Sequence, residues 1–213
     1  MKILDLFCGA GGAAEGLHRA FPEAEITGVD IKPQPRYPFN FIQADALEFP
    51  LEGYDFIWAS PPCQAFSIMQ NANVMRKDHP NLIDKTRELL IASQSHYVIE
   101  NVPGAPLHEP HLLCGQSFGL RILRHRLFET SFWMYTPPHR THVKQAKVRG
   151  KHNPVQLLKQ RHIGFTTGSV MAAYRDAMEC YWMSPDEARQ AVPPAYSEFI
   201  GRQLKRVLER RAA

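Results

Sequence analysis

An apolar run that is stopped by two prolines is the feature that most limits how this chain can fold. Residues 56–59 predict a short buried strand, and Pro61 and Pro62 follow it closely, directly before Cys63. Because proline fixes φ and lacks a backbone N–H, the strand must end there and the chain must turn. Ligands bind at the carboxyl ends of strands in open α/β sheets, so Cys63 is a candidate reactive thiol. On this stretch alone, a buried structural cysteine remains the alternative.

A strand, a tight turn and a helix open the sequence. Residues 3–6 are mostly apolar, three glycines fall between positions 9 and 12, and residues 13–20 have helical character. Glycines allow a backbone to approach a ligand closely, and the start of a helix offers free N–H groups. The spacing is not the phosphate-binding G-x-G-x-x-G pattern. The turn therefore predicts a ligand site without indicating a phosphate group.

Two carboxylates follow the next strands. The predicted strand of residues 25–30 ends in Asp30, and Asp45 comes near the end of a third strand in residues 41–46. An acidic residue in the place of Asp30 in a βαβ unit commonly accepts hydrogen bonds from ribose hydroxyls. Solvated loop acids or helix caps are the alternative. The alternation of strands and helices predicts an α/β fold with a mostly parallel sheet.

A further carboxylate and two guanidinium groups come later in the chain. The apolar strand of residues 97–102 contains Glu100, and the basic residues of 121–128 include Arg124 and Arg126. Together with Cys63, these groups are expected along one edge of the sheet.

With these motifs in this order, the chain resembles the cytosine-C5 DNA methyltransferases, in particular their short, phage-type members. The resemblance rests on residues 5–12, Asp30, Asp45, residues 61–67, residues 100–102, Arg124, Arg126 and residues 191–194. It implies a Rossmann-like S-adenosylmethionine-dependent methyltransferase fold, whose mostly parallel sheet has helices on both faces. The implied activity is transfer of a methyl group from S-adenosyl-L-methionine to C5 of a cytosine flipped out of double-stranded DNA, as in restriction-modification systems.

The resemblance implies a role for each catalytic candidate. Cys63 would add to C6 of the cytosine as a thiolate and so make C5 nucleophilic. Glu100 would donate a proton or a strong hydrogen bond to N3, which requires a raised pKa. Arg126 would hold the O2 carbonyl oxygen, and Arg124 would brace the site or a phosphate.

The resemblance also implies a site for the methyl donor at the same edge, with Asp30 on the ribose and Asp45 on the adenine amine. The residues implied to line this site are Phe7, Gly9, Ala10, Gly11, Gly12, Asp30, Ile31, Asp45, Ala46, Pro61, Leu82 and Ala191. The sequence departs from the family pattern at Ile122, where a glutamine is usual, and at Arg189 and Gln190, where the family has Gly-Asn. We expect these changes to alter the affinity for the base or the methyl donor rather than to abolish the reaction.

Positive charge is concentrated between the last two motifs. The net charge is +4, yet residues 131–175 hold eight Lys and Arg residues and no Asp or Glu. A segment with only positive charges is typical of one that binds a polyanion such as a nucleic acid. The alternative is a surface that is merely exposed to solvent. The family has its target-recognition region here, and the small size of this one predicts a short recognised site. The residues expected to contact DNA are Gln64, Ser67, Arg140, Lys144, Lys147, Arg149, Lys151, Lys159 and Arg161.

The length of 213 residues suits one core rather than two sizeable domains. We expect residues 1–130 to form the catalytic and cofactor-binding region and 131–175 the target-recognition region. Residues 176–213 should complete the catalytic domain, with a capped helix start at 184–190 and a helix at 196–211. A monomer is favoured.

The four cysteines are scattered and form no C-x-x-C pair, which argues against a disulfide framework or a zinc ribbon. His139 and His142 have a metal-ligand spacing, but no second pair accompanies them, so no metal is expected. No apolar run approaches the roughly 20 residues of a membrane span, and the first residues begin a strand at once. These features predict a cytoplasmic protein.

Three alternatives share some of these features. A transfer-RNA cytosine-C5 methyltransferase would have the same catalytic motifs, and a basic segment does not separate RNA from DNA. A non-catalytic nucleic-acid-binding relative would have little reason to keep Cys63, Glu100 and both arginines. The third alternative keeps the mechanism but transfers a different group from a modified donor.

Overall fold

A seven-stranded sheet organises the protein. The computed structural model describes residues 1–62, 82–139 and 175–212. Within these ranges the strands lie in the order β3-β2-β1-β4-β5-β7-β6. The strands are β1 (Lys2–Leu6), β2 (Glu25–Asp30), β3 (Asn40–Gln43), β4 (Phe56–Ala59), β5 (His96–Asn101), β6 (His111–Leu113) and β7 (Arg126–Thr130). The helices are α1 (Gly12–Ala20), α2 (Ile83–Ala92), α4 (Pro185–Gln190) and α5 (Pro194–Ala212), with a 3₁₀ helix η2 (Gly115–Phe118).

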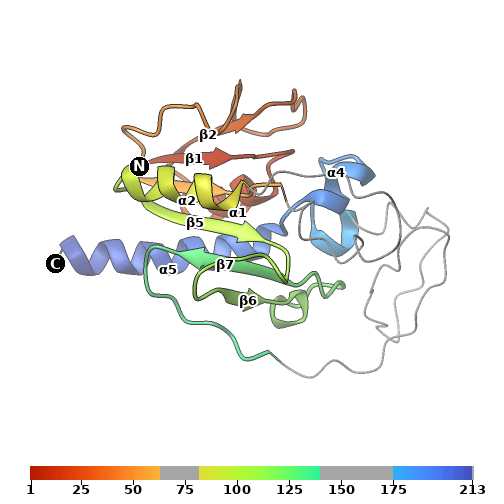
Figure 1. Cartoon of the computed structure of the whole chain (residues 1–213). Helices are drawn as coiled ribbons and strands as arrows, with labels where there is room; N and C mark the ends of the chain where they lie inside the picture. The colour runs from red at the N-terminus through yellow and green to blue at the C-terminus, as the bar shows by residue number, and fades with distance from the viewer. Residues whose placement is uncertain (63–81, 140–174, 213) are drawn as a thin grey trace.

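The order of the strands reverses between β1 and β4. The five strands β3, β2, β1, β4 and β5 are parallel, whereas β7 is antiparallel to β5, and β6 to β7. In open α/β sheets the crevice beside such a reversal, at the carboxyl ends of the strands, is where ligands bind. The turn after β1 and residues 60–62 after β4 both lie at this point (Figure 1). The mostly parallel α/β fold predicted from the sequence is confirmed.

Helices cover both faces of the sheet, with α1 and α5 on one side and α2 on the other (Figure 1). Successive side chains of a strand point to opposite faces. In β4, Phe56 and Trp58 therefore join the core on the α1 side, and Ile57 and Ala59 join the core on the α2 side. All four are fully buried. The apolar run that precedes the two prolines is thus the centre of the sheet.

Both helices expected near the carboxyl end are present. α4 begins with a capping box, in which Ser184 Oγ accepts from Glu187 N and the Glu187 carboxylate accepts from Ser184 N. α5 begins at Pro194, two residues earlier than expected, because proline is well tolerated in the first turn of a helix. Its residues Ile200 and Leu204 are fully buried, so this face of the helix packs into the core on the α1 side.

The predicted division into three regions stays a prediction, because residues 140–174 lie outside the described residues. On both sides of that interval the chain contributes to the core on the α1 side. Phe132 and Met134 are buried before it, and Ala177 and Met178 are buried after it. The described parts of the chain beyond residue 130 therefore pack with the same core as the sheet.

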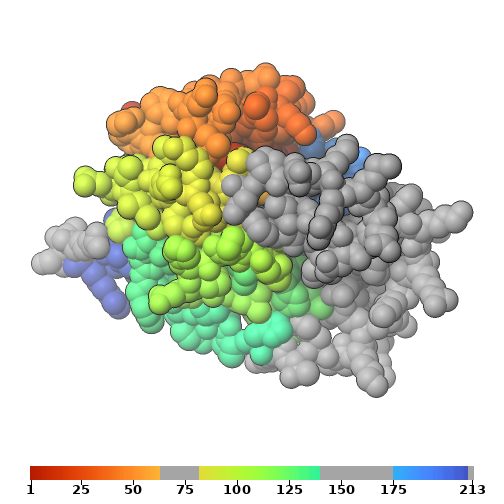
Figure 2. Space-filling view, in the orientation of Figure 1, coloured from red at the N-terminus to blue at the C-terminus, as the bar shows by residue number. Residues whose placement is uncertain are grey.

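On the face shown in Figure 2, the segment between β2 and residue 62 (orange) adjoins α2 (yellow), which adjoins the chain beyond β5 (green). Within the described ranges, no helix combines the length and the apolar character that crossing a membrane requires.

A buried ion pair connects α2 to β7. Arg87 and Glu129 are 6% and 4% exposed, and Nε and Nη2 of the arginine donate to the two carboxylate oxygens at 2.8 and 2.9 Å. Arg87 Nη2 also donates to Pro106 O, and the His108 N–H donates to Glu129. The hydrogen bonds to Glu129 raise the pKa of Arg87. This bidentate pair has the additional hydrogen bonds that a buried pair needs.

Arg87→Met is expected to lower the free energy of unfolding by about 3–5 kcal/mol, because it leaves a buried carboxylate without its counter-charge. Urea unfolding followed by circular dichroism measures the change. Arg202→Met is the matched control: its pair with Glu198 lies on an exposed part of α5, and we expect a loss of less than about 1 kcal/mol. Equal losses in the two variants would contradict this interpretation of the buried pair.

Candidate functional site

The turn after β1 has a backbone that few residue types adopt readily. Phe7, Gly9 and Gly11 have φ angles of 56°, 50° and 83°. Gly11 is required for a second reason, since a Cβ there would lie 2.7 Å from Pro38 Cδ. A Cβ on Gly9, by contrast, would meet no atom of the described residues within 4 Å. The turn therefore has open space on the side of Gly9, where a ligand can approach its backbone.

Asp30 connects the ends of β1 and β2. Its Oδ2 accepts a hydrogen bond from Gly9 N at 3.0 Å, and its Oδ1 accepts one from Lys32 N at 2.9 Å. Because each carboxylate oxygen can accept more than one hydrogen bond, both can still bind a hydroxyl group. The next residue, Ile31, is 64% exposed. A fixed carboxylate beside an exposed apolar side chain suits a nucleoside, which offers hydroxyls and a flat ring.

The other residues predicted for the donor site lie around the same strand ends. Asp45 follows β3, and its Oδ1 accepts a hydrogen bond from Leu47 N at 2.9 Å, which orders a turn. Ala10, Ala46 and Pro61 are buried, whereas Leu82 and Ala191 are half-buried beside α2 and α4. Ala10 O accepts a hydrogen bond from Trp182 Nε1 at 2.8 Å. Sequence reasoning gave Trp182 no role, since nothing in its local pattern marks a contact with a turn near the amino terminus.

The closing segment, residues 191–194, packs directly on the start of α1. A Cβ on Gly12 would collide with the carbonyl of Val192, so glycine is needed for this close approach. Arg124, at a φ of 39°, also holds this segment. Its Nη2 donates to Arg189 O at 2.8 Å and to Ala191 O at 2.9 Å. Arg124 is thus tied to the closing segment, whereas its expected role in bracing the site or a phosphate stays a prediction.

The chain that leaves β4 is fixed against the end of β5. Asn101 Nδ2 donates to Pro61 O at 3.1 Å, and Trp58 Nε1 donates to Ser60 Oγ at 2.9 Å. Ala59 is paired with Ile99 in the parallel register, which brings the two strand ends level. Sequence reasoning also gave Asn101 no role, although its place at a strand end beside a candidate catalytic residue is a usable signal. These contacts hold the residues that lead to position 63 beside β5.

Glu100 is the most unusual carboxyl group of the site. It is 7% exposed, and its Oε1 lies 2.7 Å from Arg126 Nε. The antiparallel register explains the encounter, because β7 starts where β5 ends and Asn101 is paired with Leu127. Burial raises the pKa of Glu100, and the positive charges of Arg126 and Arg124 oppose that rise. The structure therefore brings together Glu100 and Arg126, with a carboxyl group that holds its proton more tightly than usual.

Three of the four cysteines lie within the described residues, and all three are buried: Cys8, Cys114 and Cys180. Burial raises the pKa of each thiol, to about 12 for Cys180, which disfavours the thiolate that a nucleophile needs. The fourth, Cys63, lies outside the described residues. So do all the predicted DNA contacts: Gln64, Ser67, Arg140, Lys144, Lys147, Arg149, Lys151, Lys159 and Arg161.

Comparison with curated proteins gives two kinds of relative. The type II methyltransferase M.HgiCI of Herpetosiphon aurantiacus is 28% identical over 149 residues, which cover 63% of this chain and 34% of the relative. Trans-aconitate 2-methyltransferase of Yersinia pestis is 34% identical over 88 residues, covering 38% of this chain and 30% of the relative. The chain thus spans about a third of the length of these relatives.

Among solved structures, the Dnmt2 methyltransferase of S. pombe is similar over 63% of this chain and 52% of its own, with 19% identity and a TM-score of 0.45. The family profile described as C-5 cytosine-specific DNA methylase matches residues 1–118. This match covers more than half of the sequence and includes the turn after β1, Asp30, the two prolines before Cys63 and Glu100. The chain belongs to the C-5 cytosine-specific DNA methylase family.

Proposed function

We propose that this protein transfers a methyl group from S-adenosyl-L-methionine to C5 of cytosine in double-stranded DNA. Family membership supports the reaction class, and the run of basic residues between 140 and 161 supports a nucleic acid as substrate. The observation that carries the proposal is the 2.7 Å contact of Arg126 with Glu100, a carboxyl group whose pKa is raised by burial. It lies at the strand ends beside Pro61, which comes two residues before Cys63 in the sequence.

The residues at the ends of β1 and β2 fit the methyl donor. S-adenosyl-L-methionine supplies the methyl group on a sulfonium sulfur. The Asp30 carboxylate, fixed by two backbone N–H groups, accepts from the ribose hydroxyls, and exposed Ile31 contacts the adenine ring. The open side of the turn at Gly9 leaves room for the methionine moiety. Asp45 binds the adenine amine.

Cys63, Glu100 and Arg126 divide the chemistry on the cytosine. The Cys63 thiolate adds to C6, and the displaced electron pair is delocalised over C5 and N3 as Glu100 gives its proton to N3. The Arg126 guanidinium holds O2 and stabilises the negative charge that develops on the ring. C5 then takes the methyl carbon, leaving a neutral thioether. A solvent molecule takes the C5 proton as the Cys63 thiolate leaves C6, and N3 returns its proton to Glu100.

Access to the ring requires that the cytosine leave the duplex, which costs about a few kcal/mol of stacking and pairing. In this proposal the basic residues of 140–161 and the polar residues Gln64 and Ser67 hold the DNA while the base is out. Because the segment is short, we expect a recognised site of only a few base pairs. Sequencing of the methylated cytosines in plasmid DNA exposed to the protein measures the site, and a long, strictly read site would contradict this expectation.

The substrate is tested by incubating the full chain with labelled S-adenosyl-L-methionine and either duplex DNA or structured RNA of matched base composition. We expect label in the DNA, and 5-methylcytosine in its digest by mass spectrometry. Label confined to RNA would move the substrate to RNA, as in the transfer-RNA alternative. A heavier product would indicate a modified donor group. Absence of label from both would reject the proposal and favour a non-catalytic relative.

Asp30→Asn is expected to weaken donor binding by about ten- to a hundredfold, because a hydrogen bond to a charged group contributes about 1.5–3 kcal/mol. The change should increase the KM for S-adenosyl-L-methionine and leave kcat at saturating donor nearly unchanged. The matched control is Asp55→Asn, whose carboxylate also accepts a backbone N–H, from Lys2 at 2.7 Å, but lies at the opposite ends of β1 and β4. A KM that rises equally in both variants would contradict the assignment of Asp30.

A further inference from the structure

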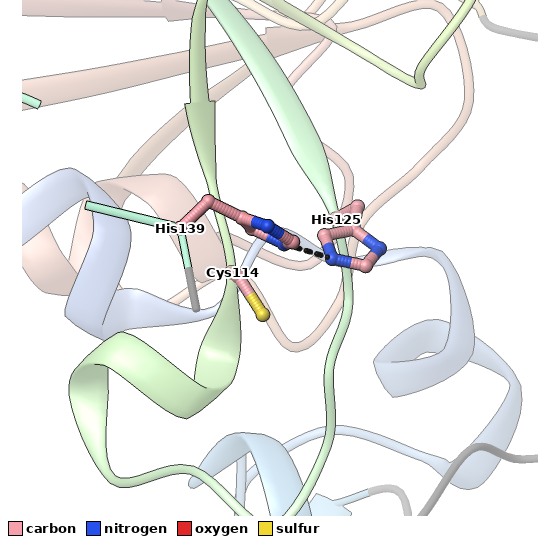
Figure 3. Close-up of side chains that lie close together, drawn as sticks. All are labelled: Cys114, His125 and His139. Atoms are coloured by element: carbon pink, nitrogen blue, oxygen red, sulfur yellow. Dashed lines mark hydrogen bonds between the residues drawn. The ribbon is translucent and has the colours of Figure 1, made fainter. Parts of the chain in front are cut away.

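Three side chains of types that bind metals lie close together next to Arg126, at the end of the β6–β7 ladder. Cys114, His125 and His139 each have one ligand atom within 4.8 Å of those of the other two. The Nε2 atoms of the two histidines are 2.9 Å apart and share a hydrogen bond. Figure 3 shows the two imidazole rings facing each other, with the Cys114 side chain beside them. None of these residues has a part in the methyl transfer proposed above.

The register of the sheet brings two of the three together. β6 and β7 are antiparallel, and Leu113 is paired with Arg126. Cys114 directly follows β6 and His125 directly precedes β7, so they stand opposite each other at this end of the ladder. His139 reaches the same point from the chain beyond β7, as the last residue before the interval 140–174. The cluster therefore links three separate segments.

The chemistry of these donors favours a transition-metal ion. Thiolate sulfur and imidazole nitrogen are the ligands that zinc-class divalent ions prefer over carboxylates and water. In a tetrahedral zinc site with bonds of about 2.0–2.3 Å, neighbouring donor atoms lie roughly 3.3–3.6 Å apart. The spacing observed here, from 2.9 Å up to 4.8 Å, brackets that separation. The three donor atoms are therefore gathered at about the separation that one ion requires.

The surroundings of the cluster support a built site rather than a chance meeting on the surface. Cys114 is 3% exposed and His125 is half-buried, so two of the donors are held within the fold. A bound cation would provide the positive charge that a buried thiolate needs.

We propose that Cys114, His125 and His139 bind one zinc-class divalent ion, with a solvent molecule as the fourth ligand. The ion ties the loop after β6 to the chain that carries Arg126, whose Nη1 donates to His125 O at 2.9 Å. It also fixes the point at which the chain enters residues 140–174. The role is structural: the metal holds the base-binding arginine and the start of the basic segment in place. The sequence predicted no metal, because the three ligands are separated by many residues and lie on three separate segments outside the strands.

The experiment uses the full chain, stripped of metal with a chelator and then dialysed against Zn²⁺ or Co²⁺ without donor or nucleic acid. We expect about one ion per chain by elemental mass spectrometry. Co²⁺ should give a thiolate-to-metal absorption band that Cys114→Ser removes. His139→Ala, a change at an exposed side chain, should lower the affinity for Zn²⁺ at least about tenfold. His139→Ala also keeps the test informative if Cys114→Ser fails to fold.

His108→Ala, at another exposed histidine, and Cys180→Ala, at another buried cysteine, are the matched controls and should bind as the wild type does. Wild-type protein that takes up no ion would overturn the proposal. So would binding that persists unchanged in both Cys114→Ser and His139→Ala. Because no methyl donor is present, failure here leaves the proposed methyl transfer untouched.

Discussion

Replacing Cys63 with alanine is expected to abolish methyl transfer completely. It should also remove the covalent complex that the wild type forms with duplex DNA containing 5-fluorocytosine. After the thiolate adds to C6 and C5 accepts the methyl group, a fluorine at C5 cannot leave as a proton does. The adduct therefore persists and survives a denaturing gel. Transfer of label and the shifted band on that gel measure the two expectations separately.

The expectation for Cys63 requires that no other cysteine can replace it as the nucleophile. Cys8, Cys114 and Cys180 are buried, and burial raises the pKa of each thiol, so none of them is a good nucleophile. Cys180→Ala is the matched control, which should keep both the activity and the trapped complex. A Cys63→Ala variant that retained activity within about tenfold of the wild type would reject covalent catalysis by this residue, since nucleophile removal costs far more than that.

Strands β2 and β4 could be predicted to the residue, and the physical reason is local. β2 ends at an acidic residue before a turn, and β4 is an apolar run closed by Ser60 and two prolines. Strand β6 was not predicted, because it has three residues, starts at His111 after a proline and lies at the edge of the sheet. The strand conformation of β6 depends on its antiparallel pairing with β7 rather than on a pattern in its own sequence.

The position of the candidate catalytic residues at one edge of the sheet could be predicted in part, because local sequence patterns mark the strand ends. Glu100 lies near the end of a recognisable strand, and the topology places such ends together. The contact of Glu100 with Arg126 was not predicted, because it depends on the antiparallel register of β5 and β7. Two hydrogen bonds near this edge could not be predicted from any local sequence pattern. Trp182 donates to Ala10 O, and Tyr37 donates to the buried carboxylate of Asp5. Both join segments far apart in the chain, which only the packed fold defines.

Glu100→Gln is expected to lower kcat by about 10²–10⁴-fold, because glutamine has no proton to give to N3 as the thiolate adds. Glutamine keeps the size of the side chain and one oxygen for Arg126, so substrate binding should change less than kcat. Steady-state kinetics with labelled donor give both parameters. Glu198→Gln is the matched control: its ion pair with Arg202 is also 2.7 Å long, but it lies on the surface of α5. Activity there should equal that of the wild type.

The pH dependence distinguishes proton donation by Glu100 from a merely structural role. Burial raises its pKa, so the protonated form that donates to N3 persists to higher pH than in an exposed glutamate and is lost as pH rises through that value. The wild-type kcat/KM should fall over this window, whereas Glu100→Gln should lack that decline. Stability should follow the same sign: a raised folded-state pKa gives a contribution that is present at low pH and lost as pH rises through it. A Glu100→Gln variant whose activity keeps the wild-type decline at high pH would show that another group titrates, and Glu100 would then be only a support for Arg126.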